Sequence, residues 1–329
     1  MKKIAVIGTG GTISALGEHR LDFTNYRTGS LTTEEIVNEL HEIRDVCEVE
    51  TSQLENFSSC DITPTHWLPL KEVVTHYLFE RNVDGVVITH GTSTMEETAY
   101  FLHLTIPTTK PIVIVGAQRP KNVFGSDAEL NLIHAIKVAL SNDAHRKGVM
   151  IVLNGGIHSA REATKVDTYR IDGLSSSDYG FLGMIDADGT VQFYRKPTRK
   201  HTVDSPFAKM RVDALPEVAI VYSYAGASGD MIRFLIEQNK VKGIVIAGTG
   251  AGKFSSYEKE ALIEAVQKGI VVVRSSRLGN GRVVPLREYE PYRFIAGDNL
   301  LPQKARILLM LSLKKTSDWT EIQRFFHEC

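Results

Sequence analysis

The sequence has few cysteines, almost no net charge and no long hydrophobic run. Its three cysteines, Cys47, Cys60 and Cys329, are too few and too scattered for a disulfide framework or a zinc ribbon. The formal net charge is −1 with no long run of one sign, which argues against nucleic acid or an anionic membrane as a partner. No stretch approaches the roughly 20 apolar residues of a membrane span, and the apolar run at residues 4–7 ends at glycines too early for a signal peptide. We therefore expect a cytoplasmic protein with reduced thiols that binds neither nucleic acid nor membrane.

Motifs for metals and nucleotides are also missing. The 11 histidines form no His-Glu-x-x-His pattern and the cysteines no Cys-x-x-Cys pattern, so we predict no metal site. Glycine-rich turns at residues 8–12 and 248–253 present backbone N–H groups of the kind that bind phosphate. Neither contains Gly-x-Gly-x-x-Gly, and Phe254 stands where a P-loop requires Ser or Thr. We therefore predict no nucleotide-binding site.

The order of the expected elements indicates an α/β protein. Short β-branched runs alternate with segments of helical spacing, which predicts a parallel sheet covered on both faces. Expected strands lie at residues 3–7, 46–54, 83–88, 112–115 and 149–153, and expected helices at 32–43, 65–81, 94–104 and 126–140. A hairpin that turns at Asp188-Gly189 interrupts this rhythm, and a second α/β unit begins near Val218. We expect an N-terminal domain over residues 1–194, a linker over 195–213 and a smaller C-terminal α/β domain over 214–329.

Two hydroxyl-rich turns follow expected strands, at residues 9–14 and 89–94. Because the carboxyl ends of parallel strands share one edge of a sheet, both turns are expected at the ligand-binding edge. Ser93 and Glu96 fit a capping box, which places Thr92 where a strand ends and a helix begins. The polar, glycine-punctuated stretch 14–30 is long enough to serve as a lid.

These turns hold the parts for nucleophilic catalysis by threonine. A hydroxyl nucleophile needs a neighbouring base, such as an amine with a lowered pKa, and N–H donors for the oxyanion. Thr12, Thr92 and Lys165 would supply them from three turns. Taken singly, each has an ordinary explanation, as a turn hydroxyl, a helix-start residue and a solvated charge.

Two motifs taken together favour the catalytic explanation over these ordinary ones. Thr9-Gly10-Gly11-Thr12-Ile13-Ser14 and His90-Gly91-Thr92, continued by Thr94-Met95-Glu96-Glu97-Thr98-Ala99, resemble the two signature motifs of the bacterial L-asparaginase/glutaminase family. Collinear similarity runs through nearly the whole chain, at residues 24–26, 115–120, 161–165, 199–202, 273–277 and 302–306. The resemblance implies a flavodoxin-like N-terminal domain, a smaller α/β C-terminal domain and a small-molecule amide substrate. It also implies no cofactor and a homo-oligomer, a dimer or a tetramer, with active sites at the dimer interface.

The resemblance also assigns roles. Thr12 is the implied nucleophile, Tyr26 its hydrogen-bonded partner, and Thr92 and Lys165 the second catalytic cluster, with Lys165 accepting a threonine proton. Backbone N–H groups near Thr12 and Thr92 would hold the oxyanion, and the Ala117 carbonyl would receive the departing nitrogen. The expected substrate-binding residues are Gly11, Ser59, Cys60, Gly91, Ser93 and Ala117, with Ser59 on the substrate carboxylate. We expect a structural role for His90.

The departures from the family pattern lie around one end of the ligand. The family has Asp at the place of Ser93, Gln at Cys60 and commonly Asn at Ala251, and a glutamate from the neighbouring subunit falls near Glu288 or Glu290. The Asp pairs with the catalytic lysine and binds the substrate α-ammonium, whereas Ser carries no charge. Since a buried ammonium without an ionic partner is unfavourable, we predict a preferred amide that lacks a free α-ammonium or holds it elsewhere. The alternative is a relocated carboxylate that replaces the Asp.

Two other function classes compete with the amidohydrolase. A non-catalytic ligand-binding or sensory homologue would keep the fold without turnover, but retention of Thr12, Tyr26, Thr92 and Lys165 argues against it. An amidotransferase subunit ranks lower, because the chain shows no obvious docking domain.

Overall fold

The computed structural model describes residues 1–329 and contains two compact units, residues 1–210 and 211–329. The division falls inside the stretch 195–213 that the sequence predicts as a linker. Residues 195–210 belong to the first unit, where the Phe207 side chain is fully buried and His201 is buried as well.

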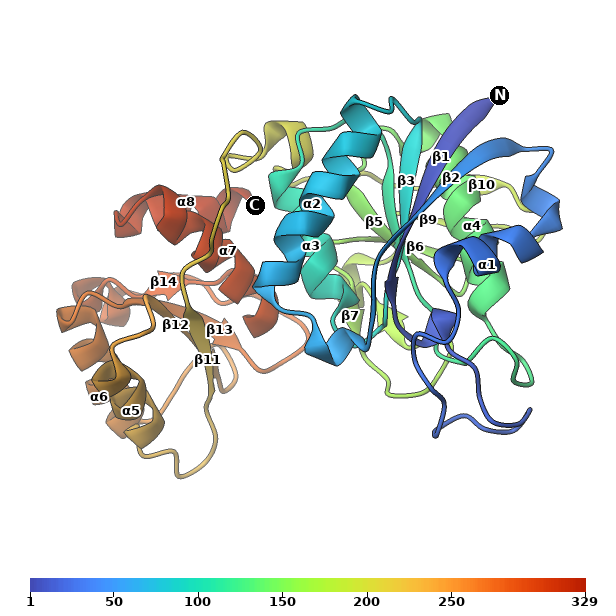
Figure 1. The fold of residues 1–329 in the computed structure, drawn as a ribbon. Helices are drawn as coiled ribbons and strands as arrows, with labels where there is room; N and C mark the ends of the chain where they lie inside the picture. The colour runs from blue at the N-terminus through green and yellow to red at the C-terminus, as the bar shows by residue number, and fades with distance from the viewer. The chain divides into compact units, whose positions relative to one another are not determined.

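The first unit is built on a sheet of eight strands in the order β10-β9-β6-β5-β4-β3-β1-β2 (Figure 1). The five strands that come first in the chain are parallel and have the flavodoxin-like order 2-1-3-4-5. Beyond β5, each of the strands β6, β9 and β10 pairs antiparallel with the strand before it in the sheet. The strands are β1 Lys2–Gly10, β2 Cys47–Phe57, β3 Gly85–Thr89, β4 Ile112–Val115, β5 Val149–Leu153, β6 Gly156–Ser159, β9 Gly183–Ile185 and β10 Val191–Phe193. The predicted α/β fold class is confirmed, and so is the hairpin, formed by β9 and β10.

Helices cover both faces of this sheet. Figure 1 shows α1 (Thr33–Glu39) and α4 (Ala128–Leu140) on one side and α2 (Pro64–Phe79) and α3 (Met95–Thr105) on the other. The central strands β3, β4 and β5 are buried along their whole length, as expected for a parallel sheet between two helical layers. On the α2–α3 side, Trp67 stacks on Phe101 with ring centroids 5.3 Å apart.

Short elements complete the first unit. A two-stranded ribbon pairs β7 (Thr164–Lys165) with β8 (Leu174–Ser175). Single 3-10 turns occur at η1 Thr12–Ser14, η2 His41–Ile43, η3 Ser59–Asp61, η4 Asn142–Ala144, η5 Ser177–Tyr179 and η6 Thr202–Asp204.

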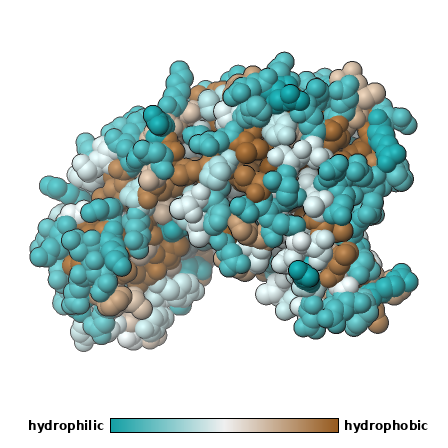
Figure 2. All heavy atoms as spheres, viewed as in Figure 1, coloured by the Kyte–Doolittle hydropathy of each residue, from teal (hydrophilic) through white to brown (hydrophobic).

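The second unit repeats the α/β plan on a smaller scale. Its four strands are parallel and lie in chain order, β11 Val218–Tyr222, β12 Gly243–Gly248, β13 Val271–Ser276 and β14 Ile295–Ala296. Its helices are α5 Asp230–Gln238, α6 Ser256–Gln267, α7 Pro302–Lys315 and α8 Trp319–Glu328, with one 3-10 segment, η7 Arg287–Tyr292. No helix in either unit is long and apolar enough to cross a membrane, and hydrophilic residues dominate the face in Figure 2.

The two helix-start predictions have different outcomes. At α1, Thr32 and Glu35 form the expected reciprocal capping box. At α3, the predicted capping box is wrong, because the helix begins at Met95 and no side chain caps it. The residues before the helix bond to Ser59 instead: the Thr94 hydroxyl donates to the Ser59 carbonyl at 2.7 Å, and the Ser93 N–H donates to Ser59 Oγ at 3.3 Å.

Candidate active site

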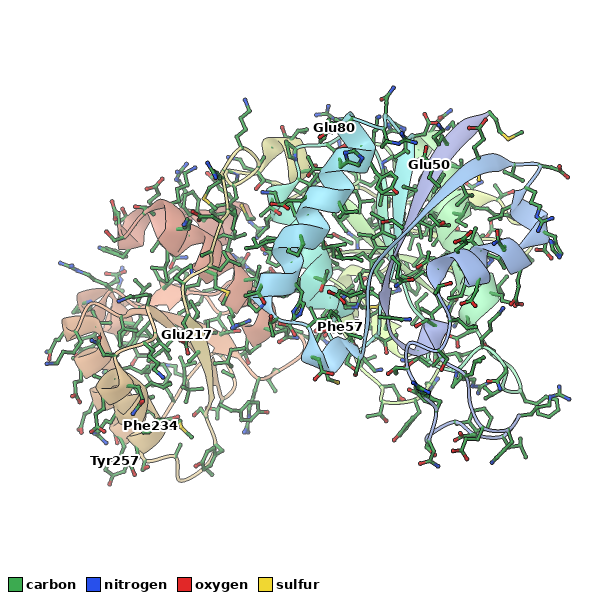
Figure 3. All side chains as sticks on the ribbon, viewed as in Figure 1. Glu50, Phe57, Glu80, Glu217, Phe234 and Tyr257 are labelled. Atoms are coloured by element: carbon green, nitrogen blue, oxygen red, sulfur yellow. The ribbon has the colours of Figure 1, made fainter.

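The two hydroxyl-rich turns meet backbone to backbone at a pair of glycines. One turn leaves β1, the other leaves β3, and these strands are neighbours in the sheet. Gly11 has φ = +90°, a conformation that L side chains rarely adopt, and a Cβ atom there would overlap the backbone of Gly91. The Gly11 N–H donates at 2.9 Å to the carbonyl of Phe57, which Figure 3 labels at the end of β2. The glycines thus bring Thr12 and Thr92 to one edge of the sheet.

Thr12 is paired with a phenol. Its Oγ1 lies 3.0 Å from the Oη of Tyr26, and Thr12 itself is buried. Tyr26 belongs to the long loop between η1 and α1, which closes on itself through a bridge between Leu16 and Arg27. The first predicted pair is therefore in hydrogen-bond contact, with one partner on a loop.

Asp22 organises that loop. Its carboxylate accepts the N–H groups of Asn25 at 2.8 Å, Glu18 at 3.0 Å and Thr24 at 3.3 Å. The N–H groups of Asn25 and Glu18 are the main causes that hold the pKa of Asp22 below its usual value. The loop that carries Tyr26 is thus folded around one ionised side chain.

Thr92 is paired with an amine. The Lys165 Nζ, which arrives on β7, donates to Thr92 Oγ1 at 2.7 Å. Burial lowers the pKa of Lys165, and the neighbouring Asp167 carboxylate offsets only part of that effect. A lysine with a lowered pKa in contact with a hydroxyl is the arrangement that general-base chemistry requires.

Gln118 completes this second cluster and was missed in the sequence. Its Oε1 accepts from Lys165 Nζ at 3.0 Å and from Thr92 Oγ1 at 3.3 Å. Gln118 follows β4, the neighbour of β3. The sequence did contain a signal for Gln118, because it lies in a glycine-containing turn directly after a buried strand. That turn reaches the same edge of the sheet as the turns that carry Thr12 and Thr92.

Ser59, Ser93 and Cys60 lie in the same cavity as the two threonine clusters. Ser59 is buried in η3 and receives the Ser93 N–H described above, so these two residues are adjacent. Cys60 is exposed, whereas Cys47 and Cys329 are buried.

A cavity of about 220 Å³ joins these groups. Nine predicted residues line it, together with Gln118 and four residues that sequence reasoning did not name. The predicted ones are Gly11, Thr12, Tyr26, Ser59, Cys60, Gly91, Thr92, Ser93 and Lys165, and the additional four are Thr28, Ser58, Thr168 and Tyr169. Ala117 is fully buried and does not line the cavity. The lining contains no Asp or Glu, so Lys165 is its only side chain with a full formal charge in the common ionisation states.

His90 contacts the backbone of the turn that carries Thr92 and the start of the helix that follows it. Its Nε2 lies 2.9 Å from the Thr98 hydroxyl, and its Nδ1 lies 2.7 Å from the Gly91 carbonyl. Thr98 Oγ1 also accepts the Trp67 indole N–H at 3.0 Å. Complete burial lowers the pKa of His90 to about 4, so the ring is neutral near pH 7 and donates from Nδ1. These contacts agree with a structural role.

The remaining predicted positions lie in the second unit. Ala251 is exposed in the turn after β12, and Glu288 forms an ion pair with Lys253 of the same unit. No three His, Cys, Asp or Glu side chains come together as a metal site would require.

Comparisons with known proteins match both units. Residues 3–199 match a family model described as asparaginase, N-terminal, and residues 217–326 one described as glutaminase/asparaginase C-terminal domain. The chain is 40% identical over its whole length to L-asparaginase 2 of Bacillus subtilis, covering 87% of that protein, and 38% identical to L-asparaginase 2 of Escherichia coli, covering 93%. A solved structure described as a probable cytoplasmic L-asparaginase from Campylobacter jejuni superposes with a TM-score of 0.96 at 41% identity, with full coverage of both chains.

Proposed function

The chain belongs to the asparaginase/glutaminase family, and from this premise we propose that it hydrolyses a side-chain amide to an acid and ammonia, with Thr12 as nucleophile. The observation that carries the proposal is the 2.7 Å contact between Lys165 Nζ and Thr92 Oγ1, in the cavity that Thr12 and Tyr26 also line.

The reaction proceeds in two displacements. As Thr12 Oγ1 attacks the amide carbon, its proton passes to the neutral Lys165 amine. The C–N bond then breaks, and the same proton is returned to the nitrogen, which leaves as ammonia. Water then attacks the resulting ester, which releases the acid and restores the Thr12 hydroxyl. Tyr26 orients the Thr12 hydroxyl, and Thr92 passes a proton to the neutral Lys165 amine. Backbone N–H groups of the two turns stabilise the oxyanion.

The charge of the cavity supports a shifted specificity. A substrate carboxylate finds the Ser59 hydroxyl there, but a substrate α-ammonium finds no carboxylate among the lining residues. Because Ser93 brings no charge, the favoured substrate is an amide without a free α-ammonium. The alternative is an ammonium bound by Glu288 or Glu290 of a neighbouring subunit.

A homo-oligomer and a cytoplasmic location belong to the same proposal. Light scattering on the purified chain tests the first, and fractionation of the source cells tests the second. A monomer that is fully active would remove any need for a neighbouring subunit's glutamate.

Ammonia release provides the test of function. The full chain and its Ser93→Asp variant are assayed with asparagine, glutamine and amides that lack the α-amino group, with Lys165→Met as the inactive reference. We expect the wild type to prefer the amides without α-ammonium and Ser93→Asp to gain asparagine turnover. Strong wild-type turnover of asparagine would contradict the specificity shift. No ammonia from any amide would favour the non-catalytic binding homologue.

A further inference from the structure

Gln118 makes contacts that neither the family resemblance nor the sequence assigned. We propose that Gln118 is a positioning residue, whose side-chain carbonyl holds the Lys165 amine against Thr92 without adding a negative charge. This inference rests on the proposed function and goes beyond it, because it identifies what orients the base in a cavity without a carboxylate.

The geometry is a triangle of three polar atoms. Lys165 Nζ lies 2.7 Å from Thr92 Oγ1 and 3.0 Å from Gln118 Oε1, and Thr92 Oγ1 lies 3.3 Å from Gln118 Oε1. In this arrangement Nζ donates to both oxygens, and the Thr92 hydroxyl donates to Gln118 Oε1. When the amine is neutral and accepts the Thr92 proton, that hydroxyl turns from Gln118 to Nζ, while an Nζ N–H still donates to Gln118 Oε1 and holds the nitrogen in place. Without the acceptor, the amine has no contact that selects this rotation, and its lone pair is less often aligned with the hydroxyl proton.

The orientation of the Gln118 amide follows from its surroundings. Gln118 is 9% exposed, and its Nε2 is buried without a hydrogen-bond partner. Exchanging the amide oxygen and nitrogen would turn N–H donors toward the Lys165 N–H groups and the Thr92 hydroxyl, both of which donate to Gln118 in the structure. The contacts at Oε1 therefore fix the amide, and the unpartnered Nε2 indicates that these contacts outweigh the loss on the other side.

The backbone that carries Gln118 is anchored from α4. The Asp127 carboxylate accepts the N–H groups of Gln118 and Arg119, each at 3.0 Å. Asn131 donates to Asp127 at 2.9 Å and to the Gly116 carbonyl at 3.0 Å. Because Asp127 and Asn131 are both buried, the turn after β4 presents Gln118 from a rigid base.

The charge state of Lys165 explains why a neutral acceptor matters. A carboxylate in the place of the Gln118 amide would favour the ammonium form, which cannot accept a proton. The titratable groups that face Lys165 are Asp167 on its own ribbon, Cys60 from η3, and Tyr26 and Tyr169 across the cavity. The Asp167 carboxylate also accepts the N–H groups of Tyr169 and Arg170, each at 2.9 Å, so its charge is partly stabilised by the backbone of its own turn.

Two substitutions at Gln118 separate the effect of its hydrogen bond to Lys165 from the effect of a charge at that place. Gln118→Met keeps the length of the side chain and removes the acceptor, and Gln118→Glu keeps the acceptor and adds a charge. The control is Gln192→Glu, which makes the same charge change on β10, at the far edge of the sheet where Gln192 is exposed. The readouts are kcat and KM across pH, and the pH dependence of Lys165 acetylation by acetic anhydride, measured by mass spectrometry on the full chain without substrate.

For Gln118→Met we expect kcat about tenfold lower at every pH, KM within about twofold, and a lower pKa of Lys165. For Gln118→Glu we expect the pKa of Lys165 and the acid limb of kcat to rise together by about one to two units, with activity recovering as the pH rises. Gln192→Glu should match the wild type in both readouts.

Each outcome decides the proposal. Wild-type kcat and an unchanged Lys165 acetylation profile in Gln118→Met would overturn it. If the wild type released ammonia from no amide, the proposed function would fail. The acetylation profiles would still decide whether Gln118 holds Lys165, because they need no substrate.

Discussion

The two threonines of the cavity are supported in different ways. Thr12 contacts a phenol carried by a loop that is folded around Asp22. Thr92 contacts an amine and an amide that come from two short, internally bonded segments, the β7–β8 ribbon and the turn after β4. One hydroxyl thus contacts a side chain on a long loop, and the other contacts side chains on segments that lie next to the sheet. Such a division suits a reaction in which substrate must enter while the base stays aligned.

Loss of the nucleophile should have the largest effect. Thr12→Ala removes the atom that forms the ester, so we expect kcat/KM to fall by about 10⁴-fold or more for whichever amide the wild type hydrolyses. Thr24→Ala, on the exposed part of the same loop, is the control and should stay near the wild type. If Thr12→Ala kept a tenth of the activity, Thr92 would become the candidate nucleophile.

Removing the partner of each threonine tests whether Thr12 and Thr92 have different roles. Lys165→Met should lower kcat by about 10³-fold because the base is lost, and Tyr26→Phe by about 10²-fold because only an orienting contact is lost. Lys71→Met provides the control, since Lys71 is another partly buried lysine whose pKa is lowered by burial, on α2. A Tyr26→Phe variant more damaged than Lys165→Met would reverse the assigned roles.

The contact between the two turns can be broken at Gly11. Gly11→Ala forces a side chain onto the backbone of Gly91 at positive φ, so we expect a loss of about 3 kcal/mol in the free energy of unfolding. Gly180→Ala is the matched control, because Gly180 has φ = +71° with no atom near its would-be Cβ, and it should lose only about 1 kcal/mol. Urea unfolding measures both. Equal losses would show that the turns need not touch.

The smallest expected effect is on the loop itself. The folded pKa of Asp22 is depressed, so its stabilisation of the loop is complete above the unfolded value near 4 and is lost as the pH falls through the folded pKa. Asp22→Asn should remove this pH dependence, speed proteolysis of residues 15–31 and lower kcat about threefold near pH 7. Asp188→Asn tests the same kind of N–H-bonded carboxylate in the β9–β10 turn, away from the loop. Equal proteolysis of wild type and Asp22→Asn across pH would refute the role of Asp22.

The sequence predicts much of the fold because its signals are local. β-branched runs predict the buried strands, and the Asp188-Gly189 turn predicts the β9–β10 hairpin. The prediction of a capping box at Ser93 was wrong because the helix begins at Met95, and Ser59, distant in sequence, bonds to Ser93 and Thr94 just before it. Thr12, Thr92 and Lys165 could be grouped only through the family resemblance, since each has an ordinary local explanation. Gln118 could not be found, because its role depends on where the Lys165 ribbon meets the turn after β4.

The hydrogen-bonded chain behind the site has a spectroscopic consequence. The Trp67 indole donates to Thr98, whose hydroxyl contacts His90, and His90 in turn contacts the Gly91 carbonyl. The protein has two tryptophans, Trp67 in the first unit and Trp319 in the second. Intrinsic fluorescence of a Trp319→Phe variant therefore reports on the turn that carries Thr92, without an attached dye. Ligand entry and the unfolding of the first unit can then be followed in the fluorescence of Trp67 alone.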